Sequence, residues 1–169
     1  MVEIYLFRHG EAGTRISPIT KDRERGLTEA GKLEMQKVGS SLAKWKLELD
    51  VVASSPLRRA RETAALLNKA MNRRKNVEEW PELSPEGSRE TLYRRLGSLK
   101  PDASVLCVGH EPYLTTLVAD LIGGNRNEGP VLRISLKKAG MAKVEISGIP
   151  REGGELRWLL TPKQIRKMS

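Results

Sequence analysis

Cysteine and histidine are scarce in this sequence of 169 residues. Cys107 is its one cysteine, so no disulfide can form within the chain and nothing indicates an oxidising compartment. The two histidines are too few to build a metal-binding cluster of Cys and His residues. We therefore expect no metal and no other cofactor.

Aromatic residues and long apolar runs are also missing. Aromatic residues make up 4% of the chain, which is few for a surface that stacks nucleic-acid bases, and no nucleic-acid-binding motif appears. No apolar run approaches the roughly 20 residues that cross a bilayer. Residues 1–7 lack the basic head and the small-residue cleavage site of a signal peptide. We expect a cytoplasmic monomer with neither a nucleic-acid nor a membrane partner.

Positive charge is plentiful. Lys and Arg outnumber Asp and Glu by 30 to 21, which gives a formal net charge of +9. A basic surface attracts nucleic acid, anionic membranes or phosphorylated ligands. With the first two disfavoured, we interpret most of this charge as solvated surface and some of it as a means of attracting a phosphorylated partner.

Strand and helix patterns alternate over the first three quarters of the chain. Short apolar runs predict strands at 2–7, 50–54 and 104–109. Capping residues, proline and apolar spacing predict helices from Thr28 to about Leu49, Pro56 to about Met71, Ser88 to about Leu99, and Pro112 to near Gly123-Gly124. In the first of these helices, the inner face is expected to hold Leu33, Val38, Leu42 and Trp45. Residues 8–27 read as a long functional loop, and 76–88 as a polar crossing segment.

From residue 131 the pattern changes to alternation. It predicts strands near 131–137, 142–147 and 155–160, with a turn at Gly153-Gly154. Alternating strands and helices indicate an α/β fold. We expect a single domain over residues 1–169. It should be a three-layer sandwich with a mainly parallel central sheet, helices on both faces and an antiparallel C-terminal hairpin at one edge.

Three predicted strands end in residues suited to chemistry. The first runs into Arg8-His9-Gly10, the second into Ser54-Ser55-Pro56-Leu57-Arg58-Arg59, and the third into Gly109-His110-Glu111. Ligands of open α/β sheets bind outside the carboxyl ends of the strands. Both histidines are therefore expected at that rim, with arginines beside them.

This combination favours a phosphoryl ligand. Arginine forks hydrogen-bond phosphoryl oxygens in a fixed geometry, and a neutral imidazole can attack phosphorus to give a phosphohistidine. A lone histidine at a strand end would more often simply bond a loop carbonyl. Two glycine-flanked histidines near arginines favour the functional interpretation.

The motifs resemble those of a known family. Arg8-His9-Gly10-Glu11, then Ser55-Pro56-Leu57-Arg58-Arg59-Ala60-x-x-Thr63, then Gly109-His110 are similar, in this order, to the motifs of the histidine phosphatase superfamily, which has the phosphoglycerate-mutase-like fold. The short length and Arg25-Gly26-Leu27-Thr28-x-x-Gly31 resemble its SixA-type phosphohistidine phosphatases.

The resemblance implies roles for five residues. His9 would be the nucleophile, Arg8 and Arg59 would hold the phosphoryl oxygens, His110 would hydrogen-bond the transferring group, and Arg25 would lie over the pocket. Arg58 is the rival of Arg59, although the position directly before Ala60 favours Arg59.

One departure from the larger members of the superfamily bears on the substrate. They carry a glutamate acid at the position where this sequence has Pro85, and Glu11, Glu82 and Glu86 remain open as substitutes. An acid speeds departure of an alcohol by about 10²–10⁴, whereas the imidazole of phosphohistidine leaves readily. We expect a metal-independent hydrolase of phosphohistidine on a protein, such as a relay domain. The alternatives are a broad small-molecule phosphomonoesterase and a non-catalytic phosphate-binding module.

Overall fold

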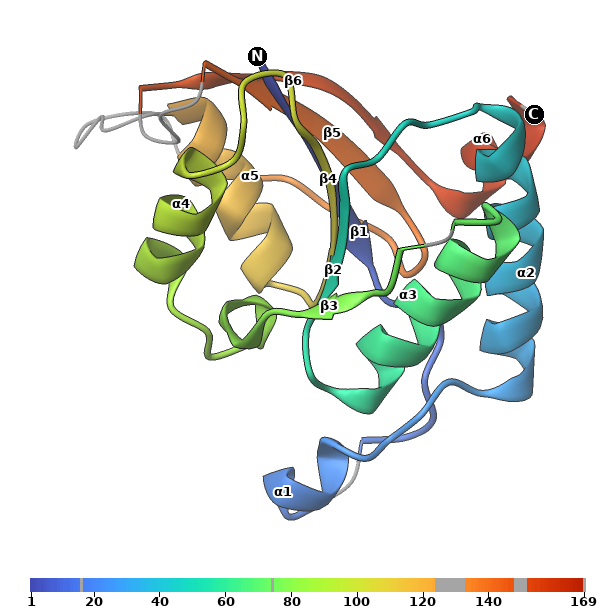
Figure 1. Ribbon diagram of the computed structural model, residues 1–169. Coiled ribbons are helices and arrows are strands. Elements are labelled where there is room, and N and C mark those ends of the chain that lie inside the picture. Colours follow the sequence, from blue (N-terminus) through green and yellow to red (C-terminus); the bar gives the residue numbers. More distant parts are fainter. Residues whose placement is uncertain (16, 74, 124–132, 148–151, 169) are drawn as a thin grey trace.

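A twisted central sheet organises the computed structural model, which describes residues 1–15, 17–73, 75–123, 133–147 and 152–168 (Figure 1). Within these ranges six strands pair in the order β3-β2-β4-β1-β5-β6. Their bounds are Val2–Arg8 for β1, Val51–Ser54 for β2, Glu78–Glu79 for β3, Ser104–Gly109 for β4, Met141–Ile146 for β5 and Gly154–Leu160 for β6. β1 to β4 are parallel, and β5 runs antiparallel to both β1 and β6. The predicted mainly parallel sheet with an antiparallel C-terminal edge hairpin is confirmed.

Helices cover both faces of the sheet (Figure 1). α2 (Glu29–Lys44), α3 (Arg58–Ala70) and α6 (Pro162–Lys167) lie on one face, and α4 (Arg89–Gly97) and α5 (Tyr113–Gly123) lie on the other. A short helix, α1 (Ile19–Asp22), projects from the body, and a 3₁₀ turn, η1 (Pro81–Leu83), precedes α4. The predicted three-layer arrangement is therefore confirmed. None of the helices within the described ranges is long and apolar enough to span a membrane.

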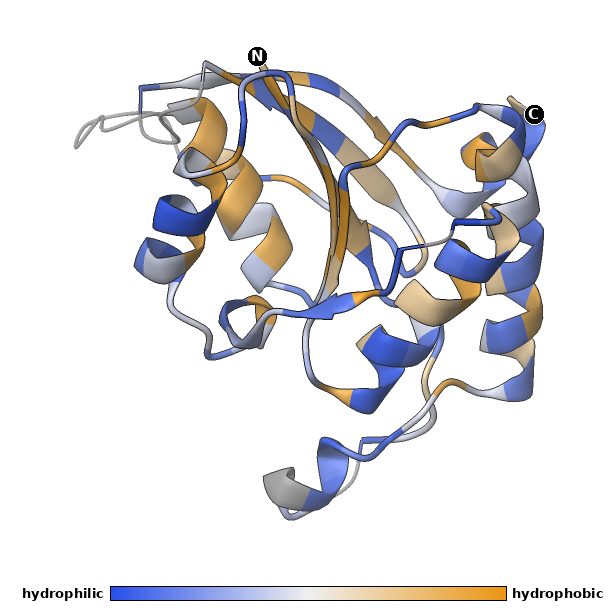
Figure 2. Ribbon diagram, in the orientation of Figure 1, coloured by the Kyte–Doolittle hydropathy of each residue, from blue (hydrophilic) through white to orange (hydrophobic). Residues whose placement is uncertain are grey.

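Alternation along β1 divides the core into two clusters. Ile4 and Leu6 pack on the side of α4 and α5, whereas Tyr5 and Phe7 pack on the side of α2, α3 and α6. All six residues of β4 are buried, as expected for a central strand covered on both faces. Figure 2 shows the hydrophobic residues on the sheet and on the helix sides that face it.

The predicted inner face of α2 was partly wrong. Leu33 is 52% exposed, while Met35, Val38 and Leu42 are fully buried and Trp45 packs against their cluster. Residues three or four positions apart share a helix face, and five positions turn about 140° around the axis, so Leu33 cannot share a face with Val38. The helix also ends at Lys44 rather than near Leu49, and Lys46, two positions later, has a left-handed backbone with φ 52°.

The predicted strand at 131–137 was also wrong in its described part. Residues 131–132 lie outside the described ranges, and 133–137 form no strand. Both edges of β1 are already paired, with β4 and β5, so no edge there is left for this segment. It instead lies near the end of β1, where the Leu136 carbonyl accepts from Arg8 Nη1 at 2.8 Å.

The sequence patterns did not predict the short elements. The loop predicted at 8–27 contains α1, the crossing segment 76–88 contains β3 and η1, and α6 follows β6. The longer helices begin one or two residues later than their predicted prolines or caps, which is within the usual uncertainty of helix ends.

Candidate active site

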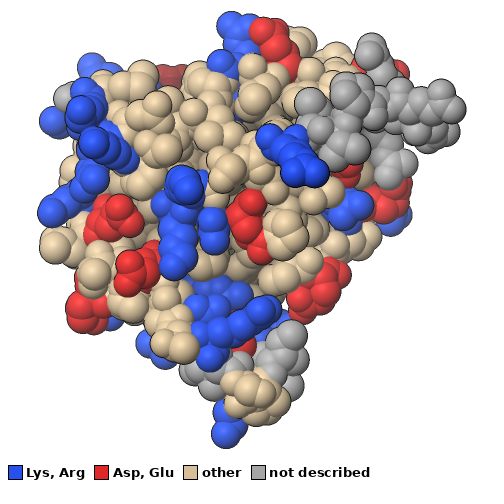
Figure 3. All heavy atoms as spheres, turned by 180° about the vertical axis from the view of Figure 1, so that it is seen from behind, with Lys and Arg blue, Asp and Glu red and all other residues tan. Residues whose placement is uncertain are grey.

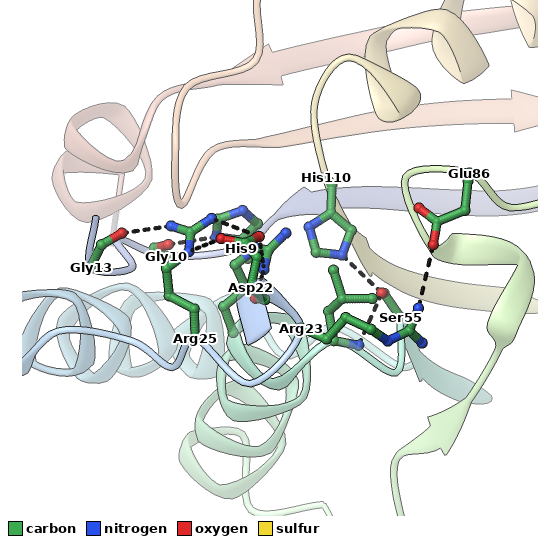
Figure 4. Close-up of polar contacts among 11 residues, drawn as sticks. His9, Gly10, Gly13, Asp22, Arg23, Arg25, Ser55, Glu86 and His110 are labelled. Atoms are coloured by element: carbon green, nitrogen blue, oxygen red, sulfur yellow. Dashed lines mark hydrogen bonds and ion pairs between the residues drawn. The ribbon is translucent and has the colours of Figure 1, made fainter. Parts of the chain in front are cut away.

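The carboxyl ends of three parallel strands bring the predicted motifs together. Arg8 lies opposite Gly109, and Ser54 lies opposite Val108, so the next residue of each strand reaches the same end of the sheet. The rings of His9 and His110 lie 5.1 Å apart between their centroids. Figure 4 shows these two side chains with the polar residues around them. The two sequence-predicted histidines therefore share one site.

His9 is buried, with 8% of its surface exposed. Its Nδ1 lies 2.7 Å from the Gly10 carbonyl oxygen. A carbonyl can only accept, so Nδ1 carries the proton and Nε2 keeps its lone pair. The pKa of His9 is lowered to about 4, with burial as the largest cause; nearby Arg59 and Arg8 act in the same direction, and the Gly10 bond opposes them. The ring is thus neutral near pH 7 with Nε2 free to act as a nucleophile.

His110 is buried against Ser55. Its Nε2 lies 2.8 Å from the Ser55 hydroxyl oxygen, while its Nδ1 is buried without a hydrogen-bond partner in the described chain. The pKa of His110 is lowered to about 2, with burial as the largest cause and His9, Arg59 and Arg25 acting in the same direction. A Ser55 hydroxyl that donates to Nε2 leaves a proton on Nδ1, which is then a donor for a ligand.

Arg8 and Arg59 each bring a guanidinium to the two histidines. Arg8 Nη1 donates to the Leu136 carbonyl at 2.8 Å, and Arg59 Nη1 donates to the Asp22 carbonyl at 3.0 Å. In both side chains Nε is buried without a hydrogen-bond partner in the described chain. These two donors and His110 Nδ1 thus have no hydrogen-bond acceptor in the described chain, and a buried donor without a partner is costly.

Arg25 reaches the same site from the loop before α2. It donates from Nε to Asp22 Oδ1 at 2.8 Å and from Nη1 to the Gly13 carbonyl at 2.6 Å (Figure 4). Its charge contributes to the lowered pKa of both histidines. The structure therefore brings the five predicted site residues together: Arg8, His9, Arg25, Arg59 and His110.

Arg58 points elsewhere. Its side chain is 51% exposed and donates from Nε to Glu62 Oε1 at 2.7 Å, whereas the Arg59 side chain is 7% exposed. Consecutive residues of a helix face directions about 100° apart, so only one of the two can enter the pocket. The structure places Arg59 there.

The sequence did not single out three further residues of this site. Asp22 pairs with Arg25 and Arg59, and Ser55 contacts His110. Thr63, quoted only as part of a motif, accepts from the Gly10 amide at 3.1 Å and donates to the Arg59 carbonyl at 2.8 Å. Thr63 lies one helical turn after Arg59 and Asp22 lies three positions before Arg25, which are the spacings that could have indicated them.

The glutamates that the sequence suggested as possible general acids lie in different surroundings. Glu82 is buried and bonded to Arg95, Glu86 is exposed and lies 3.4 Å from Arg23, and Glu11 is exposed and accepts from the Thr28 hydroxyl at 3.2 Å. Glu111, beside His110, accepts from both the amide and the hydroxyl of Thr115, and burial raises its pKa. Within the described part of the chain, none of these four carboxylates hydrogen-bonds to His9 or His110.

Comparison with known proteins decides the family. The model of the histidine phosphatase superfamily (branch 1) matches residues 4–85. Over 167 residues the chain is 31% identical to the phosphohistidine phosphatase SixA of Escherichia coli, covering 98% of this chain and 97% of SixA. The chain belongs to the histidine phosphatase superfamily. As a member, it is a phosphatase, which is a hydrolase of phosphoryl groups.

Two further similarities cover nearly the whole chain. An uncharacterized protein of Picosynechococcus sp. is 32% identical over 170 residues, covering 97% of this chain and 99% of that protein. A structure of the protein histidine phosphatase SixA complexed with tungstate matches with a TM-score of 0.80 and 28% identity, covering 95% of this chain and 97% of that one. The predicted histidine phosphatase family, its SixA-type branch and its phosphoglycerate-mutase-like fold are confirmed.

Proposed function

We propose that this histidine phosphatase removes the phosphoryl group from phosphohistidine on a protein, with His9 as the transient phosphoryl carrier. The observation that carries the proposal is the set of donors without a partner around a neutral imidazole. Arg8 Nε, Arg59 Nε and His110 Nδ1 are all buried, and the charges of both arginines act on His9. A phosphoryl group supplies the acceptor oxygens that these donors need.

The reaction has two steps. In the first, His9 Nε2 forms a bond to phosphorus as the substrate N–P bond breaks, and the substrate imidazole leaves neutral with its own ring proton. The Gly10 carbonyl accepts a hydrogen bond from His9 Nδ1–H and so stabilises the positive ring that forms. In the second, water forms a P–O bond, the P–Nε2 electron pair returns to His9, and phosphate keeps both protons of the water.

Positive charge for both transition states comes from the chain itself. Arg8, Arg25 and Arg59 act on His9 together, so charge developing on the phosphoryl oxygens meets guanidinium groups already in place. We propose that this makes the reaction independent of a metal. The SixA relative holds tungstate, a tetrahedral oxyanion, which supports an oxyanion site in this family member.

The surroundings of the glutamates support a phosphoramidate substrate over an ester. Glu82 is engaged by Arg95, and the exposed Glu86 lies 3.4 Å from Arg23, so each carboxylate already has an arginine partner. The imidazole of phosphohistidine needs no general acid. A protein substrate, such as a relay domain, agrees with the positive net charge of +9.

The test is to trap the phosphoenzyme. The protein is mixed briefly with a phosphohistidine-labelled protein, kept from acid, digested and mapped by mass spectrometry. We expect the label on His9, none in His9→Ala, and normal labelling in Arg58→Ala. Phosphate release from phosphomonoesters alone would indicate the small-molecule esterase. Tight binding of the phosphoprotein with neither label nor release would indicate a non-catalytic binding module.

A further inference from the structure

Asp22 is an acidic side chain inside the proposed phosphoryl site. It is the last residue of α1 and is 5% exposed. Figure 4 shows it close to His9 and bonded to Arg25. A carboxylate in this place repels phosphoryl oxygens, so its presence requires a physical reason.

The contacts of Asp22 supply that reason. Its Oδ1 accepts from Arg25 Nε at 2.8 Å, and its Oδ2 accepts from Arg25 Nη2 at 3.3 Å. Oδ2 also lies 3.3 Å from Arg59 Nη1, and the Asp22 carbonyl accepts from that same nitrogen at 3.0 Å. One residue thus holds two guanidinium groups that come from different parts of the chain.

These bonds leave the Nε donor of Arg59 unused. Asp22 takes Nη1 of Arg59, while Arg59 Nε stays buried without a hydrogen-bond partner in the described chain. A planar guanidinium fixed at one edge presents its other donors in a set direction. Asp22 therefore orients Arg59 without using the Nε donor.

Charge supports the same interpretation. The pKa of Arg59 is lowered by burial and then by repulsion from Arg25, and the Asp22 carboxylate opposes both effects. Two buried guanidinium groups this close would otherwise move apart toward solvent. The carboxylate offsets that repulsion when no phosphoryl group is bound.

We propose that Asp22 is a positioning residue that holds Arg25 and Arg59 in place for the transferring phosphoryl group. The proposal takes its substrate from the proposed function. The contacts between Asp22 and the two arginines do not depend on that function. Asp22 acts through the two arginines that its carboxylate contacts.

The first test compares Asp22→Asn with the wild type. An amide offers one acceptor oxygen where two are used, and its NH₂ faces a guanidinium donor. We expect kcat with a phosphohistidine protein to fall by about 10- to 100-fold, as for a misplacement of about 1 Å, with KM changing less. Tungstate binding should weaken, and Asp120→Asn, which removes an ion-paired carboxylate on α5, should leave kcat and tungstate affinity unchanged.

A double-mutant cycle separates positioning from a general structural role. If Asp22 acts through Arg25, Asp22→Asn should cost much less in an Arg25→Ala background than in the wild type. Asp22→Glu, which keeps the charge but moves it by one methylene, should also lower kcat if the Asn variant proves too unstable to assay. Melting temperatures of all variants identify loss of folding.

Three outcomes would overturn the proposal: a wild-type kcat in Asp22→Asn, full additivity in the cycle, or tighter tungstate binding with unchanged kcat. The last would make Asp22 a competitor of the ligand. A wild type that binds tungstate but leaves phosphohistidine intact would defeat the proposed function alone, since tungstate binding by the same variants would still test the positioning role.

Discussion

At the scale of single residues, burial sets the protonation of the two histidines. Desolvation is the largest cause of the lowered pKa in each, and the arginines add to it. A buried imidazole that stays neutral is what a nucleophile requires, and the same arginines that would hold the phosphoryl group keep the proton away. The two requirements of the site are therefore met by one arrangement.

This arrangement makes stability depend on pH. The ordinary pKa of His9 is 6.5 and its folded value is about 4, so the unfolded chain gains a proton between these pH values while the folded chain does not. Stability is present above pH 6.5 and is lost as pH falls toward 4, and for His110 the loss continues toward pH 2. We expect the melting temperature of His110→Gln to fall less than that of the wild type between pH 6.5 and 4. Equal slopes would contradict the buried, neutral His110.

Two adjacent arginines give a matched test of the pocket. Removing a donor that stabilises transition-state charge costs about 10²–10³ in kcat, so we expect that loss in Arg59→Ala. Arg58→Ala removes the same chemical group from an exposed pair with Glu62 and should stay within a few-fold of the wild type. Steady-state phosphate release with a phosphohistidine protein measures both. A larger loss in Arg58→Ala would reverse the assignment.

Sequence reasoning reached most of the site at this scale because motifs name residue types at fixed spacing. Arg8, His9, Arg25, Arg59 and His110 follow from such motifs. Asp22 does not, because it lies in a segment without periodicity and its proposed role depends on a contact with Arg59, 37 positions away. A contact between distant parts of the chain becomes visible only when the fold is known.

At the scale of elements, patterns that depend on burial predicted the longer strands and helices well. They did not predict the short elements. β1 and β4 are buried runs, and α2, α3 and α5 are long enough to carry a periodic face. α1, with 4 residues, and β3, with 2, are too short to show a period. The segment 133–137 has strand-like residues, but both edges of the neighbouring β1 are already paired, which composition alone cannot reveal.

The start of α2 is packed directly on the loop that serves the site. A Cβ added at Gly31 would lie 2.2 Å from the Glu11 carbonyl oxygen, which is backbone. Gly31→Ala should therefore displace the loop, cost about 1–3 kcal/mol of stability and lower kcat, because this loop holds the Gly10 and Gly13 carbonyls that bond His9 and Arg25. Thermal unfolding and phosphate release measure the two effects.

Gly13→Ala is the control in the same loop. A Cβ at Gly13 meets nothing within 4 Å, and the carbonyl that Arg25 uses is unchanged. It should shift stability by no more than about 0.5 kcal/mol. Equal effects of the two substitutions would mean that the close approach of α2 does not fix the loop.

At the scale of the whole molecule, the position of a positive side chain decides whether it can attract a substrate. Figure 3 shows acidic and basic side chains mixed over one face, with Lys and Arg gathered just above the projecting segment that carries α1. Exposed Lys21 and Arg23 belong to that segment. A protein substrate would meet this projection as it approaches the pocket, whereas a small ion need not.

Ionic strength should therefore separate the two kinds of substrate. Screening weakens long-range attraction, so kcat/KM for an acidic phosphohistidine protein should fall by about tenfold between low and high salt, and kcat/KM for a small phosphoramidate should fall less. Lys21→Glu should lower kcat/KM for the protein substrate and flatten its salt dependence. Lys69→Glu makes the same change of charge at the far end of α3, near its last residue Ala70, and should have little effect. If salt and Lys21→Glu change kcat/KM equally for both substrates, the projection does not contact a protein substrate. That result would favour the small-molecule alternative.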